Sequence, residues 1–267
     1  MHPFHDALVS FAERREIFMD NFISSLSMLE NGKVLLYVGK GVVFTIIISV
    51  IAVLISIIFG SVLAVLRNYC TKGPSKILGV ISTLYIEIFR NTPLLLWIFI
   101  CVVFCPSPSL FDKQLFGLTS VETKLLWKAA VALILFESSI IAEIIRGGLN
   151  SVLLGQFEAA KSQGFSTIQT FIYIILPQAF KNVVPTLLGQ VISTIKDSSY
   201  LANVAVIELM SRVKQVLSAA GQYNGTMAIH SSDVFVLFGF AALIYFVIDF
   251  VLSLVVRNMN KQKKAVA

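Results

Sequence analysis

The stretch VVFTIIISVIAVLISIIFGSVLAVL, from Val42 to Leu66, decides the fold of this chain, because it carries no charged residue over its whole length. A helix of about 20 apolar residues crosses the roughly 30 Å of hydrocarbon in a bilayer. Four more segments meet this test: Ile77 to Phe104, Leu125 to Ile145, Val183 to about Val206, and Val234 to Val256. The sequence therefore predicts an all-α polytopic membrane protein with about five transmembrane helices.

The composition supports this class. Hydrophobic residues make up 57% of the 267 residues and charged residues only 13%, with a mean hydropathy of +0.84, whereas about a quarter of a soluble domain is charged. The net charge of +6 comes from basic clusters beside apolar runs, which is typical of membrane topology and not of nucleic-acid binding. Cys70, Cys101 and Cys105 are too few for a disulfide framework and lack neighbouring ligands for a metal site.

The chain is expected to divide into three parts: an amino-terminal segment (1–40), a transmembrane region (41–257) and a basic tail (258–267). Within the first part, residues 11–30 alternate apolar and polar side chains at helical spacing, which favours an amphipathic helix lying on the membrane surface. Pro93 lies inside the long second span, where a missing backbone donor would kink the helix or split it in two.

The distribution of lysine and arginine predicts the orientation, because cytoplasmic loops are enriched in these residues. With five spans, the amino terminus is expected outside and the carboxyl terminus in the cytoplasm. The expected inner segments carry Arg67, Lys72, Lys76, Arg146, Lys161, Lys181, Arg257, Lys261, Lys263 and Lys264. The expected outer side carries Lys113, Lys124, Arg212 and Lys214 between spans and Arg14, Arg15, Lys33 and Lys40 before the first span.

A polar, helix-forming segment, QFEAAKSQGFSTIQTFIYIILP (Gln156 to Pro177), interrupts the apolar runs. A short helix is expected over Leu153 to Ser162, with Ala159 and Ala160 leaving one surface nearly flat and Gly164 permitting a sharp reversal. Ser166 with Gln169 has the form of a capping box, which starts a second helix that Pro177 ends or bends. For the Glu-Ala-Ala triplet alone, an ordinary connector between spans would be the better interpretation.

The full order of Glu158-Ala159-Ala160, Gly164 and Ile174-x-Leu176-Pro177 resembles the cytoplasmic signature loop of permease subunits of bacterial ABC importers. Three further blocks are similar to the polar amino acid permeases of this group, including those for glutamine, glutamate or aspartate: YIEIFRNTPLL (Tyr85 to Leu95), IAEIIRGGLNSV (Ile141 to Val152) and IKDSSYL (Ile195 to Leu201). In such a family, loss of Glu158 or Gly164 would uncouple ATP hydrolysis from transport.

The resemblance implies a bacterial inner (plasma) membrane location and several partners. These are cytoplasmic ABC ATPase subunits that use ATP and Mg, a second permease subunit in a homo- or heterodimer, and an extracytoplasmic amino-acid-binding protein. The chain itself has no GxxxxGK[ST] motif, so no cofactor and no ATP hydrolysis are expected in this polypeptide.

Charged residues inside the spans are the candidates for the substrate pathway, because buried charge is costly and usually faces a partner, water or substrate. Glu87, Arg90 and Asn91 share a face of the second span, about 15 Å from its inner end, and Glu87 and Arg90 could simply pair with each other. Glu137 needs a partner from another helix, for which Arg90 and Lys196 are the available cations. The candidate pathway comprises Glu87, Arg90, Asn91, Glu137, Ser138, Lys196, Asp197 and Ser198, which supply both signs for an amino acid.

Two other functions compete with this interpretation. An ion-gradient-driven secondary transporter often shows two internal halves, and none are visible here. An intramembrane enzyme would need an arranged nucleophile and base or metal ligands, and no histidine lies within the expected spans.

Overall fold

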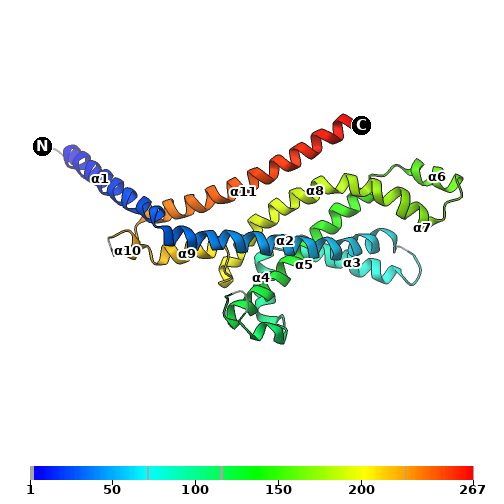
Figure 1. Cartoon of the computed structure of the whole chain (residues 1–267), viewed down its shortest axis with the longest axis horizontal. Helices are drawn as coiled ribbons and strands as arrows, with labels where there is room; N and C mark the ends of the chain where they lie inside the picture. Colours follow the sequence, from blue (N-terminus) through cyan, green and yellow to red (C-terminus); the bar gives the residue numbers. More distant parts are fainter. Residues whose placement is uncertain (1–2, 71, 115–116, 226, 267) are drawn as a thin grey trace. The chain divides into compact units, whose positions relative to one another are not determined.

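The computed structural model describes residues 3–70, 72–114, 117–225 and 227–266, and its elements are helices throughout these ranges, which confirms the all-α prediction (Figure 1). In chain order they are α1 (Pro3–Glu30), α2 (Gly32–Tyr69), α3 (Lys76–Arg90), α4 (Leu94–Phe104), η1 (Ser109–Asp112), α5 (Ser120–Asn150), α6 (Leu154–Ser162), α7 (Thr167–Thr170), the π-helical η2 (Phe171–Ile175), α8 (Leu176–Asp197), η3 (Ser198–Val204), α9 (Leu209–Ser218), α10 (Ala220–Tyr223) and α11 (Ser231–Val266).

In the described residues, four helical stretches are long and apolar enough to cross a membrane, and a fifth arises if the bent pair α3 and α4 counts as one span. Two helical stretches begin well before the apolar spans expected from the sequence. The first membrane helix begins at Gly32 and not at Val42, and the fourth stretch begins at Thr167 and not at Val183. In both cases a more polar segment continues the same helix, because backbone hydrogen bonding does not stop where the apolar run does.

The second expected span is divided at Pro93, with an angle of 109° between α3 and α4. Pro93 has extended backbone angles (φ −65°, ψ 136°) and serves as the N-cap of α4. Because proline lacks an N–H group and restricts the residue before it to extended angles, the helix ends at Arg90 and restarts at Leu94. The sequence-based prediction of a kink or a split is thus confirmed as a split.

The chain forms two compact units. Unit 1 contains Met1–Thr45 and Ile207–Ile248, and unit 2 contains Ile46–Val206 and Asp249–Ala267.

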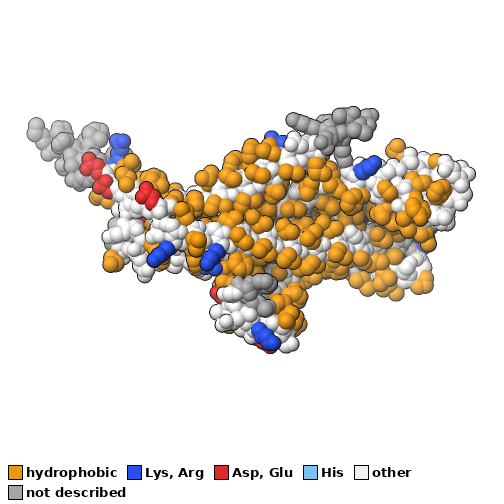
Figure 2. Space-filling model, in the orientation of Figure 1, with side chains coloured by type: hydrophobic (Ala, Val, Ile, Leu, Met, Phe, Trp, Pro, Cys, Tyr) orange, Lys and Arg blue, Asp and Glu red, His pale blue; other side chains and the backbone are white. Residues whose placement is uncertain are grey.

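In unit 2, α5 is packed against α3, α4 and α8. Buried side chains from α2, α5 and α8 meet in a cluster of Val53, Ile141, Val183 and Leu187. The opposite, outward side chains of α2 and α8 are apolar and exposed, and Figure 2 shows hydrophobic side chains covering this part of the surface. Such continuous apolar exposure is typical of a surface that meets lipid or another apolar chain.

In unit 1, Met28 of α1, Val34 and Val38 of α2, and Leu209 and Val213 of α9 are buried in one core with α10 and α11. Polar contacts join α1 to α11 and to the segment before it: Ser25 Oγ donates to Asp233 Oδ1 (2.6 Å) and Ser232 Oγ (2.9 Å), and Asn224 Nδ2 donates to Asp233 Oδ2 (2.9 Å). One face of α1 is therefore buried by protein. The membrane-surface position of this helix stays a prediction.

Glu208 caps α9 from a fully buried position, where it accepts hydrogen bonds from the backbone N–H of Ser211 (2.5 Å) and Met210 (2.9 Å). Tyr245 of α11 donates a further hydrogen bond to this carboxylate. Burial raises the pKa of Glu208 to about 7, although these hydrogen bonds oppose the rise.

Candidate functional site

The polar loop predicted from the sequence forms a helix, a reversal and a second helix. α6 carries Glu158 and Ala159 on its exposed side, whereas Ala160 is buried at 1% exposure. The expectation that both alanines leave one flat surface was therefore wrong, because consecutive helical residues point about 100° apart. Only Ala159 lies beside Glu158 on the free side, and Ala160 packs inward.

Gly164 makes the reversal after α6, as the sequence predicts. Its φ of +82° lies in the left-handed region that glycine adopts without steric cost. The Phe165 N–H donates to Ala160 O (3.1 Å) and the Gly164 N–H donates to Lys161 O (3.0 Å). This pair of bonds is a Schellman motif, which satisfies carbonyl groups at the end of the helix and fixes the direction in which the chain returns.

The second helix begins with the predicted capping box. Gln169 N–H donates to Ser166 Oγ (3.3 Å), and Ser166 N–H donates to Gln169 Oε1 (2.9 Å). Pro177 does not end this helix: α7, η2, α8 and η3 form one helical stretch from Thr167 to Val204. The π-helical turn of η2 ends at Ile175, and α8 begins at Leu176. Pro177 therefore lies in the first turn of α8, where a residue without a backbone N–H group is tolerated.

Apolar side chains surround the polar ones on the surface of this loop. Leu153 is 77% exposed, and Leu154 and Ile168 are each 71% exposed. Tyr69, the last residue of α2, makes an edge-to-face contact with Phe171 of η2 at 5.6 Å. The loop therefore lies at the same end of unit 2 as the carboxyl end of α2, and its leucines beside Glu158 are exposed.

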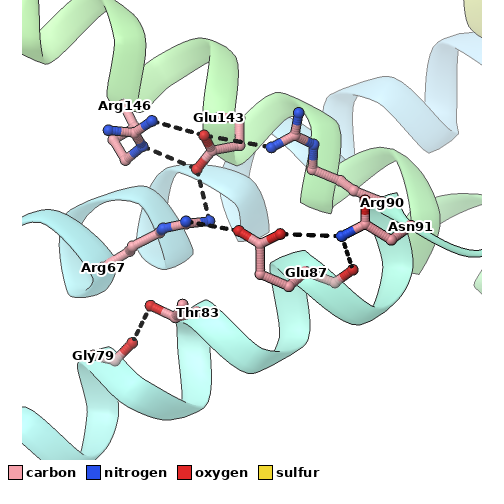
Figure 3. A network of polar contacts seen from close by, with 8 residues as sticks. All are labelled: Arg67, Gly79, Thr83, Glu87, Arg90, Asn91, Glu143 and Arg146. Atoms are coloured by element: carbon pink, nitrogen blue, oxygen red, sulfur yellow. Dashed lines mark hydrogen bonds and ion pairs between the residues drawn. The ribbon is translucent and has the colours of Figure 1, made fainter.

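A network of five charged side chains joins the carboxyl ends of α2 and α3 to α5 (Figure 3). Arg67 contacts Glu87 at 2.8 Å and Glu143 at 3.0 Å. Glu143 also pairs with Arg146 at 2.8 Å and Arg90 at 3.5 Å. In addition, Asn91 Nδ2 donates to Glu87 Oε2 (3.1 Å).

This network corrects the expected pairing of Glu87 with Arg90. Glu87 binds Arg67 of another helix, and Arg90 approaches Glu143 of α5 instead. Sequence reasoning did not include Arg67 or Arg146 among the site residues, because each directly follows an apolar run and has the pattern of an interfacial anchor. Only the packing of three helices brings these side chains together.

Glu137 belongs to a separate polar group. It is fully buried on α5, and Gln190 Nε2 of α8 donates to its Oε2 at 2.8 Å. The expected cationic partner, Arg90 or Lys196, was therefore wrong: the identified hydrogen-bond donor is a neutral amide. Among the residues that the structure describes, none donates a hydrogen bond to its other, buried oxygen, Oε1, and such a group is costly unless something else satisfies it.

Of the other predicted pathway residues, Ser138 follows Glu137 on α5, whereas Lys196, Asp197 and Ser198 lie at the end of α8 and the start of η3. Ser138 is buried and within 2.9 Å of the Tyr85 hydroxyl of α3. Lys196 and Asp197 end α8, Lys196 is exposed, and Ser198 is buried with its hydroxyl donating to Ile195 O (2.8 Å). The polar residues expected in one site thus fall into two groups, since Glu143 contacts α2 and α3 whereas Glu137 contacts α8. Their role in a pathway stays a prediction.

One sequence profile and several known proteins match most of this chain. The sequence profile described as "Binding-protein-dependent transport system inner membrane component" matches residues 56–264. A protein of Bacillus subtilis (strain 168) named "Probable glutamine ABC transporter permease protein GlnP" is 33% identical, over 85% of this chain and 93% of its own length. From the same organism, "Probable glutamine ABC transporter permease protein GlnM" is 37% identical, over 83% and 91%. The "Glutamate/aspartate import permease protein GltK" of Escherichia coli O157:H7 is 33% identical, over 85% and 93%.

Solved structures share the fold. A chain in "Crystal structure of an amino acid ABC transporter with histidines" has a TM-score of 0.70 and 26% identity, covering 88% of this chain and 98% of that one. A chain of an inward-facing MetNI methionine ABC transporter has a TM-score of 0.62 at 19% identity, covering 86% and 99%. The latter likeness concerns the fold alone.

Proposed function

The chain belongs to the family of binding-protein-dependent transport system inner membrane components, and from this membership we propose that it is the permease subunit of an ATP-driven importer of polar amino acids. The observation that carries the proposal is the exposed loop of α6 and α7, with Glu158 on its free side and Gly164 at its reversal. The names of the relatives, which include glutamine and glutamate/aspartate permeases, support the substrate class.

ATP hydrolysis belongs to a partner in this proposal. The sequence contains no GxxxxGK[ST] motif, so the nucleotide and Mg would bind cytoplasmic ABC ATPase subunits. The α6 loop is the proposed contact with them. Its exposed leucines would fill an apolar cleft, and Ala159 would let the partner's backbone approach Glu158 closely. A second permease subunit and an extracytoplasmic binding protein complete the proposed complex.

The orientation follows from the same proposal. If the α6 loop meets a cytoplasmic ATPase, the end of unit 2 that carries Tyr69 and Phe171 faces the cytoplasm. The chain then crosses a bacterial inner or plasma membrane several times, with its amino terminus outside and its carboxyl terminus inside. Arg67 and Arg146 would lie toward the cytoplasmic side, in agreement with the enrichment of basic residues there.

For the pathway, we propose that the Glu137 group is the part closest to the substrate. A zwitterionic amino acid needs an acceptor for its ammonium group, and one oxygen of Glu137 accepts no hydrogen bond from the part of the chain that the structure describes. Lys196 and Asp197 lie further along α8, where they supply both signs of charge, with Ser198 at the start of η3. The network of five charged side chains would instead hold α2, α3 and α5 together.

Reconstitution tests the function directly. The chain is co-purified with candidate ATPases, placed in nanodiscs or liposomes with candidate binding proteins, and assayed for ATP hydrolysis and uptake with each polar amino acid. We expect hydrolysis to rise with a glutamine- or glutamate-like substrate. Uptake that survives ATP depletion but stops with an uncoupler would instead identify a secondary transporter.

Charge reversal at the loop tests the coupling surface. Glu158→Lys is expected to reduce both ATPase co-purification and coupled hydrolysis. The matched control is Glu16→Lys, the same reversal at an exposed position of α1, and it is expected to leave both unchanged. If Glu158→Lys behaves like Glu16→Lys, the α6 loop is not the ATPase contact.

A further inference from the structure

Unit 1 contains a recess of about 320 Å³ between the start of α2 and the α9–α10 segment. Its lining combines hydrogen-bonding groups with small apolar ones: Lys33, Val34, Tyr37, Gln215, Val216, Ala219 and Tyr223. The Tyr37 hydroxyl donates to Gln215 Oε1, and this bond joins the two walls. The recess is therefore bounded by groups that can hold a polar partner.

Basic side chains predominate beside this recess, although the exposed Glu30 ends α1 just before α2 begins. The charged residues of α9 are Arg212 and Lys214, and those of the first three turns of α2 are Lys33 and Lys40. The Arg212 guanidinium stacks on the Tyr37 ring, 4.0 Å from its centroid, which fixes a positive charge at the wall. Lys33, Lys40 and Lys214 are exposed. Figure 2 shows lysine and arginine side chains where α2 begins beside α9.

The length of α2 places Lys33 outside the bilayer. Starting from Arg67 at the inner end, about 20 residues cross the hydrocarbon and reach Ile47, and Lys33 lies about 20 Å further along the axis. With a tilt of about 40°, which is the upper end of the usual range, the crossing takes about 26 residues and Lys33 still lies about 9 Å beyond it. The headgroup layer is about 5–8 Å thick on each side, so a soluble partner fits this recess better than a lipid headgroup.

We infer that the recess and its basic rim, formed by the first turns of α2 with α9 and α10, are a docking surface for an acidic patch on the extracytoplasmic binding protein. This inference rests on the proposed function and its orientation. It also accounts for Lys33 and Lys40, which lie on the side of the membrane where basic residues are less frequent. Complementary charge chiefly raises the rate of encounter and sets the docking orientation.

A charge reversal at the rim tests the inference in the intact complex. The probe is the binding protein that stimulates ATP hydrolysis by the wild-type complex in nanodiscs. Lys33→Glu is expected to weaken its binding about fivefold or more, equivalent to about 1 kcal/mol, and to reduce the dependence of binding on ionic strength. Lys113→Glu makes the same reversal at an exposed position in the loop between α4 and α5, and it is expected to bind like wild type.

The controls separate the possible failures. Hydrolysis without the binding protein is expected to be equal in wild type, Lys33→Glu and Lys113→Glu, which shows that each complex is assembled. Equal affinity of the binding protein for wild type and Lys33→Glu would overturn the docking surface while leaving the importer function intact. If the effect of Lys33→Glu depends on the anionic lipid content of the nanodisc and is the same with and without the binding protein, the recess is a site for lipid headgroups, and the inference is also overturned. If no binding protein stimulates the wild-type complex, the proposed function itself fails.

Discussion

Replacing Gly164 by alanine isolates the contribution of one backbone conformation to the coupling loop. A Cβ at this position would meet no heavy atom within 4 Å, so the substitution adds no clash. Its φ of +82° nevertheless remains unfavourable for an L-residue, at a cost of about 1–2 kcal/mol. We therefore expect the ratio of the ordered reversal to locally opened forms to fall by a factor of about 5–30.

Hydrogen exchange of the complex in nanodiscs, read by mass spectrometry, measures this loss. The amides of Gly164 and Phe165 report it best, because they make the two Schellman hydrogen bonds to Lys161 and Ala160. In Gly164→Ala these amides are expected to exchange faster by about the factor given above. Substrate-stimulated ATP hydrolysis is expected to fall in parallel, since the proposed ATPase contact depends on this reversal.

Gly155→Ala, in the helix α6 that precedes Gly164, is the matched control. Gly155 also has open space around its Cβ position but no positive φ, and alanine stabilises a helix by about 0.5–1 kcal/mol relative to glycine. It should leave exchange unchanged or slow it. Equal exchange in Gly164→Ala and wild type would refute the strain argument, and unchanged coupled hydrolysis despite faster exchange would refute the link to function.

Three further predictions concern packing and charge. Gly148→Ala would place a Cβ 2.0 Å from Val183 Cγ2 and should destabilise the protein by about 1–3 kcal/mol; thermal unfolding compares it with Gly147→Ala, whose Cβ meets nothing within 4 Å. Glu143→Gln leaves the three arginines of the network with one carboxylate, so it should lower the free energy of unfolding by about 1–2 kcal/mol, and by less at high salt. If neither this substitution nor added salt changes the unfolding of the protein, the network does not stabilise it. The pKa of Glu208 in the folded protein, about 7, is above its usual value of 4.5. Its contribution to the free energy of unfolding is therefore fully present below about pH 4.5 and is lost as the pH rises through about 7. Glu208→Gln should remove that part of the pH dependence of unfolding, and an unchanged profile would show that another group causes it.

Local features of the candidate site could be predicted well from the sequence. The Ser166 capping box, the reversal at Gly164 and the break at Pro93 each depend on the chemistry of a few neighbouring residues, and each is present in the structure. Helix boundaries were less predictable. Polar residues before Val42 and Val183 extend the membrane helices, because a helix continues until its backbone is capped or broken, whatever the hydropathy of its side chains.

The sequence by itself determined the membrane class, the helical fold, the number of spans and the resemblance that leads to the family, because hydropathy over 20 residues and local capping are properties of short segments. Only the tertiary structure decided which charges meet. Glu87 and Arg90 are close in sequence but bind partners on α2 and α5, Glu137 is bound by Gln190 of α8, and Lys33 shares a recess with α9 and α10. Such pairs depend on how helices distant in sequence pack against each other, and no periodicity within a single helix specifies that packing.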